Sequence, residues 1–323
     1  MTDITMIEAA AARLHGHARV TPLLNAPLLD AAAGRRIFVK AESLQLTGSF
    51  KFRGGWSAIS AMDPATRTRG VMAYSSGNHA QGVALAAQRH GIPAVILMPS
   101  DAPQVKIANT RAYGGEVILY DRATEDRDAL GARLTAERGL TLIKPFDDPA
   151  VIAGQGTIGL ELAEQAAAQG IAQAPVVTCC GGGGLSAGIA LALQARAPGL
   201  TVRPAEPAGF DDMTRSLASG QIQRNAQTTG SICDAILTPQ PGALTFPILQ
   251  RLSGPGLTAT DDEALRAMAL AFTHLRLVLE PGGAIALAAA IHRDDLPDTV
   301  ICTASGGNVD AAIFRMALDR HAP

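Results

Sequence analysis

The sequence predicts an α/β protein with parallel sheets flanked by helices, arranged in two domains. Three observations lead to this expectation. Short apolar runs alternate with alanine-rich stretches of helical length, which is the pattern of strands followed by helices in parallel sheets. The 323 residues suffice for two domains of ordinary size. Hydrophobic residues make up 47% of the chain and charged residues 17%, as expected for well-packed globular units.

The expected elements follow one another in a regular order. Thr5 and Glu8 are spaced like a capping box, so we expect an amphipathic helix that continues through Leu14. After it, each apolar run precedes a helical stretch, and TVRPAEP is one further strand. The pairs are RIFVKA and the helix from Phe52, GVMAYSS and HAQGVALAAQRHG, AVILMPS and VKIANTRAYGG, EVILYD and residues 125–139, VVTCCGG and LSAGIALALQARA, and TVICTASGG and a last helix.

Charge and cysteine usage exclude several classes of protein. Lys and Arg number 27 against 29 Asp and Glu, and no block of like charges could follow a phosphate backbone, so nucleic acid is not an expected partner. Cys179, Cys180, Cys233 and Cys302 lack CxxC spacing, so we expect buried thiols in a reducing compartment. No basic leader precedes the first helix, and no apolar run approaches the ~18 residues of a membrane span. We expect a soluble, cytoplasmic protein.

Lys51 stands between two phenylalanines in the segment SLQLTGSFKFRGG, which is rich in glycine and hydroxyl groups. A lysine in this setting is either a solvated charge at the end of a turn or an amine held in an apolar pocket for chemistry. The segment alone leaves both interpretations open.

Three strand-to-helix junctions are rich in glycine and polar side chains. In VVTCCGGGGLSAG, four glycines can point N–H groups at one anion, which favours phosphate binding over a packing turn or a dinucleotide site. AYSSGNHAQG offers N–H, hydroxyl and amide groups for a carboxylate or a ring substituent, and TASGGNVD contains Ser305 and two glycines. Each turn alone could be an N-cap. Because ligands bind at the carboxyl ends of strands in open α/β folds, we expect the three turns to meet at one site.

Together SLQLTGSFKFRGG, SSGNHAQG, CCGGGGLSAG, EPGGA and SGGNVD resemble the pyridoxal-phosphate enzymes of the serine/threonine dehydratase and serine racemase family. The resemblance covers essentially the whole chain, in the same order. It implies fold type II of these enzymes, as in the tryptophan synthase β chain, with the cofactor in a cleft between two domains. By this resemblance the small domain spans residues 70–146, and the large domain comprises residues 1–69 and 147–323.

The resemblance also implies which residues hold the cofactor. Lys51 matches the lysine that forms a Schiff base with the cofactor aldehyde, and burial between Phe50 and Phe52 would disfavour its ammonium form. The free amine would then take the Cα proton of the substrate. Asn78 would hydrogen-bond the ring oxygen O3′, while Phe50 packs against the ring. The phosphate would be held by Gly181, Gly182, Gly183, Gly184 and Leu185.

Two serines have implied roles in the chemistry. Ser305 matches the residue that faces the pyridine nitrogen, where a hydroxyl leaves the nitrogen largely unprotonated and favours expulsion of a β-leaving group. Ser76 falls where serine racemases have a second acid/base on the ring face opposite the lysine, which permits racemisation without proving it. The turn expected to bind the substrate comprises Ser75, Ser76, Gly77, Asn78 and His79.

The segment AEPAGFDDMTRSL resembles the divalent-metal site of the same family. Its ligands would be the carboxylates of Glu206 and Asp212 and the backbone oxygen of Phe210. Oxygen ligands suit Mg²⁺, Mn²⁺ or Ca²⁺ rather than zinc. The alternative is an acidic loop that caps a helix.

The expected substrates are β-hydroxy amino acids, and Arg127 bears on which one. It lies where serine racemases have a mobile arginine that can bind a second carboxylate bidentately; the alternative is a pair with Asp126 or Glu125 on an exposed helix. Residues 231–249, which contain the pattern PxPGxLTFPI, also resemble the hydroxyaspartate dehydratases more than the threonine enzymes. We therefore expect loss of water from 3-hydroxyaspartate to iminosuccinate, then oxaloacetate and ammonia. Threonine or serine dehydration and serine racemisation are the alternatives.

Other classes of function are weaker. A nucleotide-dependent oxidoreductase would rest on the glycine turns alone, and residues 200–203 provide no acid for a ribose. A non-catalytic binder would need Lys51 or Ser305 replaced. Because one helix follows SGGNVD, we expect no regulatory extension of the kind found in biosynthetic threonine enzymes. The resemblance also implies a homodimer.

Overall fold

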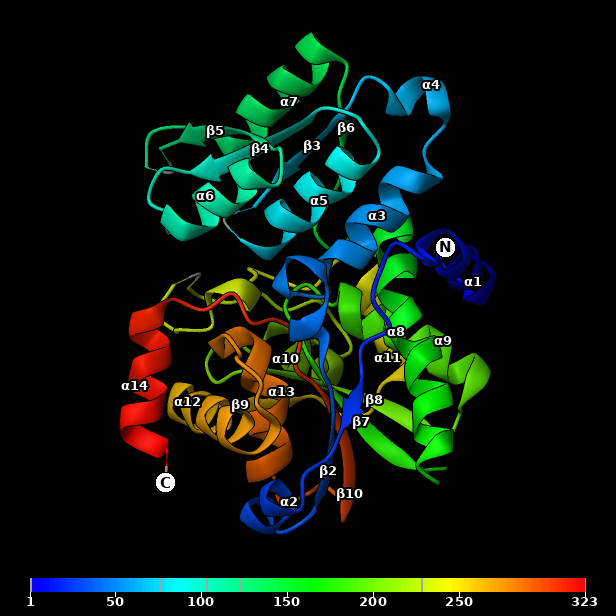
Figure 1. Cartoon of the computed structure of the whole chain (residues 1–323), viewed down its shortest axis with the longest axis vertical. Helices are drawn as coiled ribbons and strands as arrows, with labels where there is room; N and C mark the ends of the chain where they lie inside the picture. The colour runs from blue at the N-terminus through cyan, green and yellow to red at the C-terminus, as the bar shows by residue number, and fades with distance from the viewer. Residues whose placement is uncertain (1, 76, 103, 122, 228, 323) are drawn as a thin grey trace.

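The computed structural model describes residues 2–75, 77–102, 104–121, 123–227 and 229–322. In this part of the chain the strands form two sheets, one of six strands and one of four. Figure 1 shows the four-stranded sheet in the upper part of the molecule and the six-stranded sheet in the lower part. The expectation of an α/β protein with two parallel sheets flanked by helices is confirmed.

The six-stranded sheet joins strands from the two ends of the chain. Its order is β1-β2-β10-β7-β8-β9, in which β1 is antiparallel to β2 and the other neighbours are parallel. Strand β10 lies between β2 and β7, and its Ile301 is in register with Phe38 and Val176. The strands are β1 (Leu23–Leu24), β2 (Arg36–Lys40), β7 (Ala174–Cys179), β8 (Leu200–Pro207), β9 (Leu257–Ala259) and β10 (Thr299–Thr303).

The four-stranded sheet is built from one continuous stretch of chain. Its order is β5-β4-β3-β6, and all neighbouring strands are parallel. These strands all fall inside the range predicted for a small domain, although the division of the chain at residues 70 and 146 stays a prediction. The strands are β3 (Val71–Tyr74), β4 (Ala94–Pro99), β5 (Glu116–Tyr120) and β6 (Thr141–Leu142).

Helices cover both faces of both sheets, and α3 packs on α5 and on α8 between the sheets. The α-helices are α1 (Ile4–Leu14), α2 (Pro27–Ala33), α3 (Lys51–Ala61), α4 (Pro64–Arg67), α5 (Asn78–Arg89), α6 (Gln104–Ala112), α7 (Arg127–Arg138), α8 (Pro149–Ala168), α9 (Gly184–Arg196), α10 (Asp212–Ser219), α11 (Thr245–Leu252), α12 (Asp261–Leu270), α13 (Pro281–His292) and α14 (Ala311–His321). The short helical turns are η1 (Glu42–Leu44), η2 (Leu46–Gly48), η3 (Asp234–Ile236) and η4 (Ala271–Leu275).

The apolar cores follow the alternation of side chains along the strands. On β2, Ile37 and Val39 belong to the cluster packed under α12 and α13, whereas Phe38 belongs to the cluster packed under α8 and α9. On β10, Cys302 and Ile301 divide in the same way. Successive residues of a strand point to opposite faces, so a strand covered on both faces reads as a continuous apolar run. This explains why such runs marked the strands in the sequence.

The opening helix begins differently from the prediction. Asp3, not Thr5, is the N-cap, and its carboxylate accepts a hydrogen bond of 3.0 Å from the backbone N–H of Met6. The predicted capping box of Thr5 and Glu8 is therefore wrong. Because the cap is Asp3, the helix also includes Ile4 and Thr5, and its buried residues are Ile7, Ala10 and Leu14.

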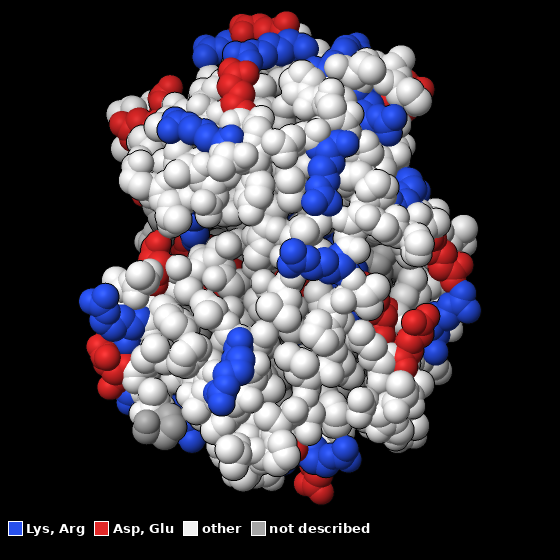
Figure 2. Space-filling view, viewed as in Figure 1, with Lys and Arg blue, Asp and Glu red and all other residues white. Residues whose placement is uncertain are grey.

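The surface and the cysteines agree with the limits set by composition. None of the described helices is long and apolar enough to span a bilayer. All four cysteines are buried and unbonded, which confirms the prediction of free thiols. On the face seen in Figure 2, blue and red side chains are scattered among each other and leave wide white areas, so this face carries no continuous patch of one sign.

Candidate active site

A cavity of about 1050 Å³ lies between the two sheets. Its walls include the last residues of β3, Tyr74, and of β7, Cys179, together with Ser305 just beyond β10, so the carboxyl ends of strands meet there as expected. The predicted site residues that line it are Phe50, Lys51, Ser75, Gly77, Asn78, His79, Arg127, Gly181, Gly182, Gly183, Gly184, Leu185 and Ser305. Ser76 lies outside the described residues.

Lys51 opens helix α3 and points its amine into the cavity. Nζ donates a hydrogen bond of 2.8 Å to the carbonyl oxygen of Pro145 and lies 5.1 Å from the centre of the Phe50 ring. Burial lowers the pKa of the amine to about 8. Phe52 does not share the cavity, because it is fully buried and packs against Trp56. Of the two phenylalanines, only Phe50 therefore lies beside the amine.

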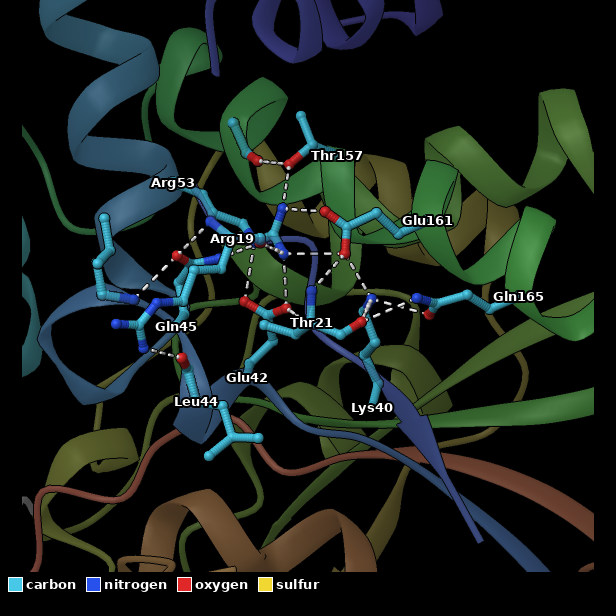
Figure 3. A network of polar contacts seen from close by, with 12 residues as sticks. Arg19, Thr21, Lys40, Glu42, Leu44, Gln45, Arg53, Thr157, Glu161 and Gln165 are labelled. Atoms are coloured by element: carbon cyan, nitrogen blue, oxygen red, sulfur yellow. Dashed lines mark hydrogen bonds and ion pairs between the residues drawn. The ribbon is translucent and has the colours of Figure 1, made fainter. Parts of the chain in front are cut away.

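A buried network of charges holds the helix that carries Lys51 (Figure 3). Arg53, on the first turn of α3, pairs with Glu42 at 2.8 Å and with Glu161 of α8 at 2.6 Å. Lys40 of β2 pairs with Glu161 at 2.5 Å. Burial opposes ionisation of Glu42, but the charges of Arg53 and Lys40 prevail and lower its pKa. Two cations balance two carboxylates, and the network ties α3 to β2 and α8.

The glycine run after β7 forms a cup of backbone donors. Gly183 has a φ of +92°, and a Cβ on Gly182 would lie 2.3 Å from the ring of Phe146, so neither position tolerates a side chain. The N–H groups of Gly181, Gly182 and Gly183 donate to no other described residue. The carbonyl of Gly182 is turned away and accepts a hydrogen bond of 2.6 Å from Thr245. Helix α9 begins directly behind this cup, so its positive end also faces an anion held there.

The turn between β3 and α5 presents polar groups to the cavity in a fixed arrangement. The N–H of Gly77 donates to Ser75 Oγ at 3.1 Å. His79 is buried, and its Nε2 lies 2.9 Å from the carbonyl oxygen of Ile143, which can only accept, so this nitrogen carries the hydrogen. Burial and the charge of Lys51 lower the pKa of His79 to about 3. His79 is therefore neutral near pH 7, and its buried Nδ1 has no hydrogen-bond partner among the described residues.

Asn78 is held from both sides by residues that the sequence reasoning did not single out. Its Nδ2 donates to Glu280 Oε1 at 2.5 Å, and its Oδ1 accepts from Asn308 at 2.7 Å. Glu280 is 2% exposed, lines the cavity and has no described partner for Oε2. Burial raises its pKa to about 7, although Lys106 and Asn78 oppose this. The orientation of the Asn78 amide is thus set, with one N–H left for the cavity.

Ser305 sits at the floor of the cavity beside the segment that carries Lys51. Its carbonyl accepts a hydrogen bond of 3.1 Å from the N–H of Phe50, and its own N–H donates to Gly283 at 3.1 Å. The side chain is 4% exposed. Chain segments from opposite ends of the sequence therefore fix Ser305, Phe50 and Lys51 relative to one another.

Arg127 lies at the rim of the cavity. Its side chain is 50% exposed, pairs with Asp128 at 2.9 Å and lies over the ring of Tyr74 at 5.3 Å. Asp126 instead caps α7 by accepting from the N–H groups of Asp128 and Ala129. The ion-pair partner is thus Asp128 rather than Asp126 or Glu125, and because Arg127 also lines the cavity, its binding of a second carboxylate stays a prediction.

Lys106 of α6 is a cation of the cavity wall that the sequence reasoning missed. Its side chain is 7% exposed, and Nζ pairs with Asp234 of η3 at 2.9 Å. Burial opposes its charge, but Asp234 and Glu280 outweigh burial and raise the pKa of this lysine. In the sequence, VKIANTR reads as an ordinary helix, so the only signal was its place after a strand that ends at the cavity.

The three predicted metal ligands lie outside the cavity wall. Glu206 accepts hydrogen bonds from the backbone N–H groups of Met213 and Thr214 at 2.9 and 2.7 Å, so it caps α10. Asp212 accepts from Asn225 at 2.6 Å, and its buried Oδ2 has no described partner. Burial raises the pKa of Glu206 to about 8 and that of Asp212 to about 6. Among the described residues no group of three or more His, Cys, Asp or Glu side chains is placed to hold a metal.

The geometry defines a class of enzyme before any relative is considered. A desolvated amine faces one end of an interior cavity that holds a cup for an anion, a neutral hydroxyl and an oriented amide. Such a set suits a small phosphorylated carbonyl compound held through the amine.

Comparison with known proteins agrees with this class. The family described as "Pyridoxal-phosphate dependent enzyme" matches residues 14–307. An L-threo-3-hydroxyaspartate ammonia-lyase from a Pseudomonas species is 43% identical over 303 residues, which are 93% of each chain. A serine racemase from Schizosaccharomyces pombe is 39% identical over 306 residues, covering 94% of this chain and 93% of the relative. The solved structure of maize serine racemase has a TM-score of 0.91 at 35% identity and covers 99% of this chain and 97% of that one.

The chain belongs to the family of pyridoxal-phosphate-dependent enzymes. The predicted family, fold type II and cofactor are thereby confirmed.

Proposed function

We propose that this protein is an ammonia-lyase that removes water from a β-hydroxy amino acid, with 3-hydroxyaspartate as its best substrate. Lys51 carries this proposal, because its desolvated amine shares one cavity with the glycine cup and Ser305. The names of relatives support elimination, since hydroxyaspartate ammonia-lyases and threonine deaminases are among them.

The described residues fit the cofactor. Lys51 would hold it through Nζ, and Gly181–Leu185 would bind its phosphate with the N–H groups that have no other described acceptor. Asn78 would donate its remaining N–H to the ring oxygen, and Ser305 would face the ring nitrogen. Phe50 lies close enough to the amine to pack on the ring. When bound, pyridoxal phosphate withdraws electrons from Cα of the attached amino acid and makes its proton acidic.

The side chains then divide the proton chemistry. Lys51 takes the Cα proton on Nζ, for which a pKa near 8 leaves a useful fraction of free amine at neutral pH. The Cα–H and Cβ–OH bonds break, and the hydroxyl leaves as water with one proton. The product from 3-hydroxyaspartate is iminosuccinate, which water hydrolyses to oxaloacetate and ammonia. His79 stays neutral, because its ring titrates well below neutral pH, so its role is to position its neighbours rather than to carry a proton.

Threonine or serine dehydration and serine racemisation are the second candidates. They are supported by relatives named threonine ammonia-lyase and serine racemase. Racemisation needs an acid on the opposite face of the ring, and Ser76, the residue predicted for this role, lies outside the described residues. Its role stays a prediction.

A panel of substrates tests the proposal. We expect the purified protein with pyridoxal phosphate to release ketoacid faster from L-threo-3-hydroxyaspartate than from L-serine or L-threonine, with D-serine formation measured alongside. A protein that absorbs no visible light after addition of pyridoxal phosphate, or that releases no ketoacid from any of these amino acids, would contradict the proposal.

We also propose a divalent cation, Mg²⁺ before Mn²⁺ or Ca²⁺, at Glu206, Asp212 and the carbonyl of Phe210. The support is the chemistry of the donors and the buried Asp212 Oδ2, which lacks a described partner. Waters would complete the coordination. Chelator treatment should lower the melting temperature, and Mg²⁺ should restore it. An unchanged melting temperature would leave Glu206 as a helix cap alone. The homodimer and the cytoplasmic location stay predictions.

A further inference from the structure

We propose that Lys106 binds the second carboxylate of the substrate and so selects a dicarboxylic β-hydroxy amino acid over serine or threonine. Lys106 has this role only within the proposed function, because serine and threonine have no second carboxylate. The proposal adds to that function the residue that recognises the side chain of the substrate.

Lys106 lies beside the turn that is expected to bind the amino acid. A Cβ built on Gly77 would lie 3.4 Å from Cδ and 3.6 Å from Nζ of Lys106. The same turn leads into α5, whose positive end favours a first carboxylate. The lysine therefore places a second positive charge beside the turn that offers the first.

The structure already shows Lys106 holding a carboxylate. Its partner is Asp234, whose side chain is 54% exposed while that of Lys106 is 7% exposed. An ion pair with one well-solvated partner is worth little, so Asp234 can turn to water at small cost. The ammonium, in contrast, is buried and needs an anion. A substrate carboxylate that displaces Asp234 restores the same kind of pair inside the cavity.

The other cations of the described cavity wall suit this role less well. Lys51 is needed for the cofactor, and Lys144 is exposed. Arg127 is half exposed and already paired with Asp128 at the rim. A charge in water contributes less to selectivity than a buried one, because solvent screens it and replaces its hydrogen bonds.

The charges around Lys106 permit the exchange. Asp234, Glu280 and Asp310 act on its ammonium and keep it protonated at neutral pH. Glu280 is engaged with Asn78 and stays in place when Asp234 moves. One carboxylate therefore leaves as one enters, and the net charge around the lysine does not change.

Kinetics of the holoenzyme with two substrates test the proposal. In Lys106→Met, which keeps the length of the side chain, we expect KM for 3-hydroxyaspartate to rise ~100-fold, while kcat/KM for L-serine changes less than ~3-fold. Lys106→Arg should recover most of the loss, since it restores the charge. Asp234→Asn should lower KM for 3-hydroxyaspartate, because the competing carboxylate is gone. Equal losses on both substrates would overturn the proposal, because Lys106 would then serve the shared carboxylate or the fold.

Arg127→Ala is the matched control at the rim. We expect it to change the ratio of the two substrates less than Lys106→Met does, and the reverse order would overturn the proposal. Melting temperature and visible absorbance of each holoenzyme report whether the variants are folded and loaded. Should Lys106→Met fail to fold, the exposed Asp234→Asn still tests the proposal, because an unchanged or raised KM for 3-hydroxyaspartate in this variant would overturn it.

Binding of an unreactive dicarboxylate separates this proposal from the proposed function. Succinate, titrated into holoenzyme by calorimetry with propionate as the monocarboxylate control, should bind wild type well and Lys106→Met at least ~30-fold more weakly. This readout holds even if the wild type releases no ketoacid from 3-hydroxyaspartate, which would contradict the function but not the carboxylate site. Equal affinity of the two proteins for succinate would overturn the role of Lys106.

Discussion

Lys40, which is fully buried, and Lys51, which is partly buried, lie close together in the chain, yet their amines have different surroundings. Lys40 Nζ donates to three oxygens, those of Thr21, Glu161 and Gln165, at 2.7, 2.5 and 2.9 Å. Lys51 Nζ has one described acceptor, the carbonyl of Pro145, at 2.8 Å. An ammonium with every hydrogen engaged is fixed, whereas one with hydrogens to spare, whose pKa burial lowers to about 8, can give up a proton. The number of fixed acceptors and the place in the cavity wall separate the chemical lysine from the structural one here.

The same contrast holds for the two groups of charges around them. In the network behind α3, Arg53 meets two carboxylates and each carboxylate meets a cation. In the cavity, Oε2 of Glu280 has no described partner, and the partner of Lys106 is Asp234, whose side chain is about half exposed. The first group fixes α3 to β2 and α8, and the second has polar atoms that a ligand can bind.

The largest expected effect comes from removing the amine of the cavity. Lys51→Met should lower kcat/KM by at least ~10³-fold, because it removes the amine that is proposed to hold the cofactor and to take the Cα proton. In the wild type, the rate at which cofactor-free protein captures pyridoxal phosphate should rise with pH around a midpoint near 8, where Lys51 loses its proton. Absorbance after rapid mixing measures this rate.

Lys40→Met is the control for this variant. It should lower stability by about 1–3 kcal/mol, because it frees buried acceptors, while activity per folded molecule is kept. Loss of activity from Lys40→Met with unchanged stability would erase the distinction between the two lysines.

The next effect concerns the paired network. Arg53→Met leaves the fully buried Glu42 without its main cation and should cost about 3–5 kcal/mol in urea unfolding. Adding Glu42→Gln should recover part of this loss, since the uncompensated charge is then gone. A cost below about 1 kcal/mol would mean that solvent reaches the network.

The smallest effect is a change in pH dependence at Glu280. Burial raises its pKa from 4.5 to about 7, so the folded protein binds more protons than the unfolded chain between these values. Stability of the cofactor-free wild type should therefore fall as pH rises through this window, and more steeply than in Glu280→Gln. Urea unfolding at pH 5 and pH 8 measures the difference. Parallel losses in the two proteins would show that Glu280 ionises freely.

The sequence predicted those parts of the site that depend on one short segment of chain. Glycine runs at strand ends dictate backbone donors, and Lys51 lies in a short segment rich in glycine and hydroxyl groups. Glu280 belongs to the segment EPGGA, but its neighbour Pro281 is typical of a helix start, and the contact with Asn78 depends on packing across 202 positions of chain. Such contacts are properties of the fold and leave no local pattern.

Charged residues were the hardest to predict. The sequence analysis did not single out Lys40 or Arg53, because their shared partner Glu161 lies on α8, far along the chain. Arg127 lines the cavity, but its ion pair is with Asp128 on its own helix, which the sequence analysis did not name. A cation pairs with whichever anion folding brings near, so its role follows from topology rather than from its own segment.

The position of β10 has a consequence for the order in which the protein matures. Strands β3 to β6 come from one continuous stretch, so their sheet can form as that stretch leaves the ribosome. The other sheet cannot close until Thr299–Thr303 has been made, because β10 is the strand that joins β2 to β7. Until then Lys51 has neither Ser305 nor the glycine cup opposite it. The cofactor therefore binds only after β10 has been made. A nascent chain halted before β10 has the Lys51 amine but no site that holds the cofactor.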